Sequence, residues 1–532
     1  MNSTQRWTLI AAIIGSGAVF LDGTVVNLAL KRIGQELPAS MVGILEGQTY
    51  IVSGYLAVLA ALLILGGALS DHYGRRRVFA IGLASFAVTS ALCGLAPTME
   101  WLILFRLVQG ASGALLVPGS LALINSCFEG PERGRAFGIW ASATSALTLL
   151  GPLVGGLLVD TIGWRSAFLI NVPVLAAALW VTLRHVQETR DLSSRRFDWL
   201  GSAVAAIAVG GLSAGLIRGQ ERAWQDPLAW IFIIAGVIAL IAFPILMATR
   251  PDPLVPIELF RSRAFVAINI ATFFIYGALY VVLSYQGLVL QGTLGYTALG
   301  AGAIGIPVGI LLALLSTRIG TVAGRRGSRP FLIAGPLIVA AGMLWYARLP
   351  VDSEPWVLSL DVPATWVPPL DAIVDILPAV LLTGAGMAMV VSPLVNTLMG
   401  SIPGRFSGLG SAFNNSVSRV GQPLLGAIIF IVISASFYAT LGATTGVDTA
   451  DPSVRQQFPP LNAPTGATAE QTAAAASASI EAFHLAMFLA AVLLVVGSAV
   501  SYVGLRGERR ATGEPDPAAT DRSEAGPVPA GG

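Results

Sequence analysis

The chain carries one acidic residue within its first long apolar stretch and a basic loop directly after its second. Asp22 lies in the run LDGTVVNLAL at residues 21–30, and the second apolar stretch ends in GALSDHYGRRRV at residues 67–78. A carboxylate within a membrane span is costly, so it marks a functional-site hypothesis by default. A short basic loop between two spans fixes which end faces the cytoplasm. Together the two features predict a polytopic membrane protein that moves a proton or a cation.

The composition supports membrane insertion. Of 532 residues 55% are hydrophobic and 11% are charged, whereas a soluble domain carries about 25% charged residues. The formal net charge of +2 gives no reason to expect a nucleic-acid partner. Cys93 and Cys127 fall in or beside predicted spans without metal-ligand spacing, so we expect two small buried side chains and no metal.

Apolar runs of about 20 residues, the length that crosses a bilayer, recur along the whole chain. The first run is too long for a signal-peptide core of about 7–15 residues, so we expect an uncleaved first span. The pattern predicts fourteen spans, at residues 8–30, 43–66, 77–97, 101–125, 136–159, 165–186, 198–218, 228–248, 264–290, 298–317, 329–348, 376–399, 406–440 and 481–505.

Three segments depart from this pattern. The run at 406–440 is too long for one straight span, so its outer end is expected to bend or leave the membrane. The outer segment 441–480 is low in complexity and is expected to be a tether, with a short surface helix near Thr472–Ala482. The tail 507–532 is rich in Pro, Gly, Ala and charge and is predicted to be disordered.

Arginine is concentrated in alternate loops, for example at Arg75–Arg77, Arg261–Arg263 and Arg325–Arg326. This asymmetry predicts an even number of spans with both termini in the cytoplasm. Of the 31 Lys and Arg residues only Lys31 is a lysine. Such a bias is typical of a GC-rich bacterial genome, which favours a bacterial cell (inner) membrane.

A weak internal repeat relates two basic loops, because Gly74 and Gly327 align when GRRR is set against GSRP. Repeats of this kind build many transporters, with the site near the midplane between the halves. We therefore predict four parts: an N-terminal six-helix half at 1–190, two linker helices at 191–255, a C-terminal six-helix half at 256–506 and the tail 507–532.

Asp22 and Arg106 are the candidate proton-coupling residues. Asp22 lies 14 residues beyond Thr8, about 21 Å along a helix, and Arg106 lies five residues from the outer end of its span. The two side chains are thus predicted at depths where they could meet. A shifting balance between Arg attraction and desolvation would let the carboxylate take up and release a proton. The alternative is a static ion pair that only holds helices together.

Polar residues at helical spacing predict a substrate cavity. Asn269, Thr272, Tyr276, Tyr280 and Ser284 share one face of the span at 264–290, although helix–helix hydrogen bonding would explain them too. Arg419 lies near mid-membrane without an acid at matching depth, which suits either a structural role or an anionic substrate group. The other predicted cavity residues are Asn27, Gln109, Glu46, Tyr50 and Asn414. Glu46 could instead lie at the level of the lipid headgroups.

Five motifs in order resemble the major facilitator superfamily, in its fourteen-helix drug:proton antiporter branch. They are LDGTVVNLAL from Leu21, GALSD with GRRR from Gly67, RLVQG from Arg106, GP with GG from Gly151, and WR with FLINVP from Trp164. The chain departs at Lys31, where the family usually has proline, and at Tyr50, where it usually has tryptophan. Some relatives carry acids deep in second-half spans; their absence here argues against a polyspecific site for cations.

The resemblance implies roles for two further groups of residues. It implies an all-α major facilitator fold of two six-helix halves plus two inserted helices. Asp71, Gly74 and Arg75 would form a cytoplasmic gate that latches the halves. Gly151, Pro152, Gly155 and Gly156 would form a tight seam that discourages leak, although ordinary small-residue packing is the alternative.

The sequence therefore favours a proton-coupled antiporter that exports hydrophobic or amphipathic small molecules, with no cofactor beyond the proton gradient. Alternatives are a dedicated exporter of one endogenous metabolite or antibiotic, a symporter, or a sensor without transport. No GxxxxGK[ST] nucleotide loop is present. The three histidines, His72, His185 and His484, lie at span ends or loops, so an enzyme is not expected. We expect a monomer whose partners are substrate, protons and lipid.

Overall fold

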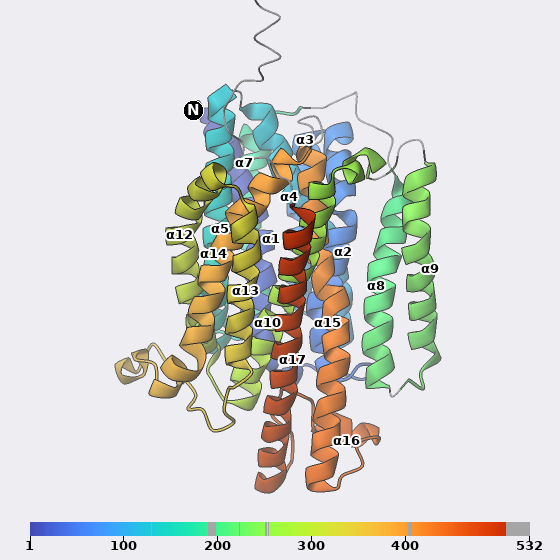
Figure 1. Cartoon of the computed structure of the whole chain (residues 1–532), viewed down its shortest axis with the longest axis vertical. Coiled ribbons are helices and arrows are strands. Elements are labelled where there is room, and N and C mark those ends of the chain that lie inside the picture. The colour runs from blue at the N-terminus through green and yellow to red at the C-terminus, as the bar shows by residue number, and fades with distance from the viewer. Residues whose placement is uncertain are drawn as a thin grey trace, which may run out of the picture.

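The computed structural model is a bundle of long, roughly parallel helices (Figure 1) and describes residues 1–128, 130–189, 198–222, 224–250, 253, 255–402 and 407–506. Helices suit a bilayer because they satisfy every backbone polar group internally. Within those ranges thirteen helical segments are long and apolar enough to cross a membrane. With α5 (Gly130–Thr161), a further helix of 32 residues, the number agrees with the fourteen predicted spans. The all-α membrane fold is confirmed.

The helices from the first part of the chain pack on one another around α1 and α4. Their bounds are α1 (Ser3–Glu36), α2 (Ile44–Tyr73), α3 (Arg75–Gly94), α4 (Met99–Cys127), α5, α6 (Ser166–Leu169) and α7 (Asn171–His185). Helix α1 contacts α4, α5 and α7, while α2 and α3 lie against α4. This arrangement brings the apolar stretch with Asp22 to the middle of the group, where it is shielded from lipid.

The two linker helices, α8 (Trp199–Glu221) and α9 (Pro227–Thr249), stand at the side of the bundle (Figure 1). Helix α8 packs on α2 and α15, and α9 packs on α8. Leucine, isoleucine and tryptophan side chains of α9 are exposed along its outer face, as expected for a helix that meets lipid. The predicted boundaries of this insert at residues 191 and 255 stay a prediction.

The later helices form a second group around α10, α14 and α17. Their bounds are η1 (Ile257–Arg261), α10 (Arg263–Leu288), η2 (Val289–Thr293), α11 (Ala298–Ala303), α12 (Ile306–Arg326), α13 (Arg329–Tyr346), η3 (Pro363–Trp366), η4 (Ala372–Ile376), α14 (Leu377–Gly400), α15 (Ser407–Thr445), α16 (Pro452–Gln457) and α17 (Ala469–Gly504). The two groups meet where α15 packs on α2, α11 on α5, and α10 on α1.

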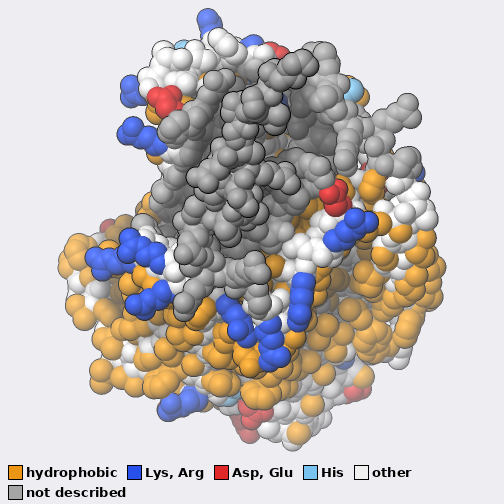
Figure 2. All heavy atoms as spheres, turned by 45° about the horizontal axis from the view of Figure 1, so that its top comes forward, with side chains coloured by type: hydrophobic (Ala, Val, Ile, Leu, Met, Phe, Trp, Pro, Cys, Tyr) orange, Lys and Arg blue, Asp and Glu red, His pale blue; other side chains and the backbone are white. Residues whose placement is uncertain are grey.

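We name the two ends of the bundle by Figure 1. The upper end carries the N-terminus, the turn at Gly74 and the end of α17, and the lower end carries α16 and residues 347–371. Figure 2 brings the upper end forward and shows Lys and Arg side chains gathered around it. The arginine-rich loops of the sequence thus share one end of the molecule. The predicted tail 507–532 lies outside the described residues.

Two helices continue well beyond their neighbours at the lower end (Figure 1). Helix α15 has 39 residues and α17 has 36, which at 1.5 Å per residue makes both much longer than the bilayer core of about 30 Å. The prediction of a separate short surface helix near Thr472–Ala482 is therefore wrong. Alanine is the best helix former, so this stretch extends α17 without a break.

The segment between α15 and α17 is more than a tether, because part of it is buried. Phe458 and Leu461 are 1% and 0% exposed, and Asn462 is 8% exposed. We call Phe458–Asn462, which follows α16 at the lower end (Figure 1), the plug. The Asn462 amide donates to Gln48 Oε1 and accepts from Gln48 Nε2, both at 3.0 Å. The plug thus lies between the two helix groups, a position that the sequence did not indicate.

Candidate functional site

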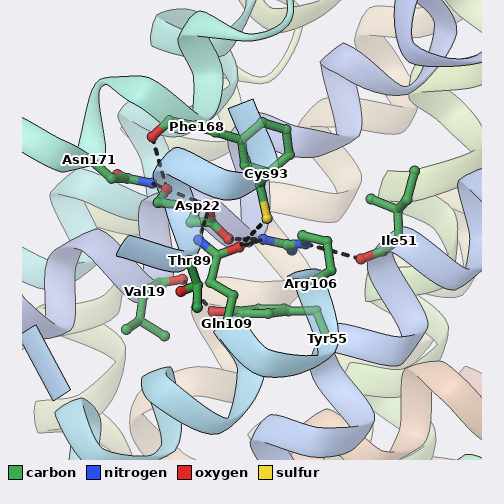
Figure 3. Close-up of polar contacts among 12 residues, drawn as sticks. Val19, Asp22, Ile51, Tyr55, Thr89, Cys93, Arg106, Gln109, Phe168 and Asn171 are labelled. Carbon is green, nitrogen blue, oxygen red and sulfur yellow. Dashed lines mark hydrogen bonds and ion pairs between the residues drawn. The ribbon is translucent and has the colours of Figure 1, made fainter. Parts of the chain in front are cut away.

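A buried ion pair lies at the centre of the first helix group. Asp22 on α1 and Arg106 on α4 are each 1% exposed, and Arg106 Nη1 donates to Asp22 Oδ2. The pair that the sequence placed at matching depths is therefore in direct contact (Figure 3). Charges removed from water are stable only with paired and hydrogen-bonded partners.

Further contacts hold the guanidinium of Arg106 in place. Its Nε donates to the Ile51 carbonyl at 3.2 Å, and its Nη1 also donates to Gln109 Oε1 at 2.8 Å. The Tyr55 ring lies 3.9 Å from the guanidinium carbon, so the cation rests on an aromatic face. These contacts do not depend on Asp22, so Arg106 has supports that would remain if the carboxylate lost its charge.

Two amides complete the surroundings of Asp22. Gln109 Nε2 and Asn171 Nδ2 both donate to Asp22 Oδ1 at 3.3 Å, and Asn171 also donates to Ser90 Oγ at 3.1 Å. Helices α1, α4 and α7 thus meet at one carboxylate, and α3 joins the cluster through Ser90 (Figure 3). Sequence reasoning gave Asn171 no role, although it stands in the FLINVP motif. Gln109 belongs to this cluster and is not among the cavity-lining residues, contrary to the prediction.

A cavity lies between the two helix groups. It borders the turn of α1 that carries Asp22, on the side of that turn opposite to Asp22. Its lining residues are Val19, Phe20, Gly23, Thr24, Asn27, Val52, Leu56, Thr148, Tyr280, Ser284 and Arg419. Of the predicted cavity residues, Asn27, Tyr280 and Arg419 are at this wall. Ser284 Oγ donates to Asn27 Oδ1 at 3.2 Å and so joins α10 to α1 across the cavity. Apolar walls with a few polar groups are typical of small-molecule sites. The cavity volume of about 30 Å³ holds about one water, so in this conformation the site is closed and must widen before it can admit a substrate.

Several predicted cavity residues instead bond neighbouring helices. Asn414 Nδ2 donates to Asn269 Oδ1 at 3.0 Å and to Thr272 Oγ1 at 2.9 Å, which is the helix–helix alternative. Tyr276 packs beside Tyr280, with ring centroids 6.2 Å apart, and is not part of the cavity lining. The stripe on α10 is therefore divided between a helix contact and the cavity.

Glu46 and Tyr50 lie away from the cavity, against α8. Glu46 Oε2 accepts from the Gly43 backbone N–H at 2.9 Å, and its Oε1 lies 3.9 Å from Arg218 Nη1. The Tyr50 hydroxyl donates to the Ala214 carbonyl at 2.9 Å. Glu46 thus caps the start of α2, where the helix dipole favours an acid, and the expectation that it faces substrate is not met.

The GP and GG motif of α5 lies at two close helix contacts. A Cβ at Gly151 would lie 1.9 Å from Thr24 Oγ1, and one at Gly155 would lie 3.0 Å from Val25 Cα. A Cβ at Gly156 would lie 2.4 Å from the Ala298 carbonyl oxygen on α11. Pro152 faces α11 too, since a Cβ at Gly302 would lie 2.3 Å from its carbonyl oxygen. One side of α5 thus packs on α1 and the other on the second helix group.

Comparison with known proteins decides the family. The model of the Major Facilitator Superfamily matches residues 12–426. The chain belongs to this superfamily. The multidrug resistance protein Stp of Mycobacterium tuberculosis is 32% identical over 447 residues, which are 83% of this chain and 78% of that protein. The tetracenomycin C resistance and export protein of Streptomyces glaucescens is 31% identical over 433 residues, covering 80% of this chain and 76% of that protein.

Solved structures agree on the fold of this superfamily member. A bacterial homolog to the human lysosomal transporter Spinster, in an inward-facing and occupied conformation, matches with a TM-score of 0.60 and 16% identity. The match covers 95% of this chain and 98% of that one. The chain is thus a multi-pass membrane protein with the major facilitator fold, and the family indicated by its motifs is confirmed.

The α2–α3 turn of this superfamily member is tied to the end of α7. Gly74 has φ +110°, a conformation that L side chains rarely adopt. Glu188 accepts from the backbone N–H groups of Arg76 and Arg77, both at 3.1 Å, and so caps α3. The Arg75 N–H donates to the Thr189 carbonyl at 3.0 Å. The side chain of Asp71 lies outside the described part of the chain, so its predicted gating role stays a prediction.

Gly156→Ala is expected to shift the protein away from the conformation in which α5 and α11 touch. The added Cβ would meet the Ala298 carbonyl oxygen only in this conformation, and such overpacking costs about 1–3 kcal/mol. Labelling of an introduced Asn27→Cys by a membrane-impermeant thiol reagent from the lower end should speed up by about tenfold. Gly210→Ala is the matched control, because a Cβ there meets nothing within 4 Å. Equal labelling rates in the two variants would contradict the expectation.

Proposed function

We propose that this protein exports hydrophobic or amphipathic small molecules from bacterial cells in exchange for protons. The relatives named for multidrug resistance and for tetracenomycin C export support this proposal. The observation that carries it is the Asp22–Arg106 pair, 1% exposed, on the helix turn whose other side lines the cavity. In the proposed cycle Asp22 binds the proton, and the adjacent cavity binds the substrate once it widens.

The coupling works through α1. A proton that binds Asp22 neutralises its charge and weakens the bond to Arg106, which the Ile51 carbonyl and Gln109 continue to hold. The constraint on the α1 turn is thereby relaxed, and Val19, Phe20 and Gly23 on this turn line the cavity. Protonation thus changes the preference between conformations in which the cavity opens to one end or the other, since a ligand shifts an equilibrium by its differential affinity.

The direction of transport follows from the proposed orientation. The arginine-rich upper end, shown in Figure 2, faces the cytoplasm, so both termini lie inside. The α5–α11 contact and the plug lie at the lower end and, in this orientation, close the cavity on the outside. The protein works as a monomer, draws its energy from the proton gradient and catalyses no chemical step.

A dedicated exporter of one compound is the second candidate. It is favoured by the relative whose name refers to tetracenomycin C alone. Competition distinguishes the two candidates, because unrelated compounds inhibit transport by a polyspecific exporter and leave a dedicated one unaffected.

Everted membrane vesicles with an acidified lumen test the proposed function. A panel of lipophilic cations, neutral compounds and lipophilic acids is added, and lumenal pH is followed with a fluorescent amine. We expect at least one compound to dissipate the pH gradient in vesicles that contain the protein and not in vesicles from cells without it. Transport of a compound without any proton movement would overturn the proposed coupling.

A further inference from the structure

Arg419 on α15 is a buried cation without a counter-ion. Its side chain is 5% exposed and lies at the wall of the cavity. Its Nε has no hydrogen-bond partner. Within the described ranges no side chain forms an ion pair with it, and its guanidinium carbon lies 5.3 Å from the centroid of the Phe20 ring. An uncompensated charge in a protein interior is costly, which makes such a residue a candidate ligand-binding group.

Arg106, the other arginine near the cavity, differs from Arg419 because its charge is balanced by an acid. Arg106 binds Asp22, so this pair is neutral and leaves no carboxylate for Arg419. The described residues that line the cavity include no Asp or Glu. The cavity therefore carries one net positive charge when it is empty. A cationic ligand would be repelled there, whereas an anionic group would restore charge balance.

The remaining walls define the rest of the ligand. Val19, Val52 and Leu56 offer apolar surface, and Phe20 offers an aromatic ring. The hydroxyl of Ser284 and the amide of Asn27 lie across the cavity and are already bonded to each other. A planar guanidinium binds a carboxylate through two parallel hydrogen bonds. When the cavity widens from its present volume of about 30 Å³, these groups suit a molecule with an apolar or aromatic body and one acidic group.

We propose that the preferred substrates are amphipathic organic acids and that Arg419 binds their carboxylate or acidic phenol. This inference rests on the proposed export function, because it assigns the substrate class of the same cavity. The inference goes beyond the proposed function because it predicts that lipophilic cations are poor substrates. Among the described residues that line the cavity, Arg419 is the only charged one, so we expect this single side chain to set the selectivity.

Three probes with the same ring system test the inference on the full-length protein in nanodiscs. They are 1-naphthylacetate, which is anionic, 1-naphthylacetamide, which is neutral, and 1-naphthylmethylammonium, which is cationic. Titration calorimetry of the wild type should give 1-naphthylacetate an affinity about 10- to 100-fold above that of the cation, the range of a hydrogen bond to a charged group. Equal affinities, or a preference for the cation, would overturn the inference without any variant.

Substitutions then show whether Arg419 causes the preference. Arg419→Gln should lower the affinity for 1-naphthylacetate about 10- to 100-fold and leave that for the amide unchanged. The affinity of Arg419→Lys for 1-naphthylacetate should lie between those of the wild type and Arg419→Gln, because lysine keeps the charge but cannot form the two parallel hydrogen bonds. Arg348→Gln, at an exposed arginine that packs on Trp345, is the matched control. An unchanged anion affinity in Arg419→Gln would contradict the inference.

Vesicle measurements separate this inference from the proposed function. Proton movement driven by cations as strongly as by acids, and insensitive to Arg419→Gln, would refute the substrate class and keep the antiport. Arg419-dependent binding of 1-naphthylacetate without proton movement would support the substrate class and refute the antiport.

Discussion

Asp22→Asn is expected to abolish proton-coupled export and to leave folded protein in the membrane. Asparagine has nearly the shape of aspartate and cannot take up a proton near neutral pH. Substrate-induced proton movement in vesicles should fall by at least ~100-fold, the lower range for loss of a proton-transfer group. The fluorescence assay described above measures this loss directly.

The fold around Asp22 should survive the substitution. Arg106 keeps its bonds to the Ile51 carbonyl and to Gln109 Oε1, and the new amide oxygen can still accept from Arg106. The free energy of unfolding should therefore fall by less than the about 3–5 kcal/mol typical of a broken buried ion pair. Thermal unfolding of the detergent-purified variant measures the loss.

Exchange of substrate for substrate distinguishes proton coupling from a static ion pair. Counterflow across vesicles without a pH gradient needs no proton, so it should persist in Asp22→Asn. Glu36→Gln is the matched control, since it makes the same change on the same helix at a half-exposed site. Proton movement that survives in Asp22→Asn would show that Asp22 only holds helices together.

The sequence carried enough information to find the Asp22–Arg106 pair but not its full surroundings. An acid in an apolar span is rare, and helix rise alone places it at the depth of Arg106. Asn171 completes the cluster, yet an asparagine near a helix start has many possible roles. Only the three-dimensional packing of α7 on α1 and α3 shows that Asn171 binds the Asp22 carboxylate.

The errors about Glu46 and Asn414 have different physical causes. Glu46 is the third residue after Gly43 and accepts from its backbone N–H, but glycine lacks the side chain that completes a capping box, so the sequence signature of that motif is absent here. Asn414 lies on a polar helix face, as its pattern suggests, but periodicity does not say what covers that face. Here Asn269 and Thr272 cover it in place of a cavity.

The plug could not have been predicted, because its contacts join residues far apart in the chain. Gln48 and Asn462 are separated by 414 positions and both are uncharged. The Leu461 N–H donates to Ser479 Oγ on α17 at 3.2 Å, and α15, α16 and α17 flank the plug in the chain. The plug is thus anchored on the second helix group, while Gln48 belongs to the first.

This anchoring makes the plug a candidate for a gate at the lower end of the bundle. Alternating access requires the two helix groups to separate at the lower end. The plug would then move with the second group, so the paired amides of Gln48 and Asn462 would have to part. A covalent bond at this point should therefore stop the cycle, whereas a bond within the second group should not.

Cross-linking of Gln48→Cys to Asn462→Cys is expected to abolish export reversibly. A short bis-methanethiosulfonate reagent suits the gap that two amide side chains now fill, and reductant should restore at least about half of the activity. The background carries Cys127→Ser, while Cys93 is fully buried. Thr440→Cys with Glu481→Cys is the matched control, because these side chains bond at 2.9 Å between α15 and α17 within one group. Full export by the protein with the Gln48→Cys to Asn462→Cys cross-link would show that the plug stays in place throughout transport. The exit path for substrate would then lie elsewhere along the contact between the two helix groups.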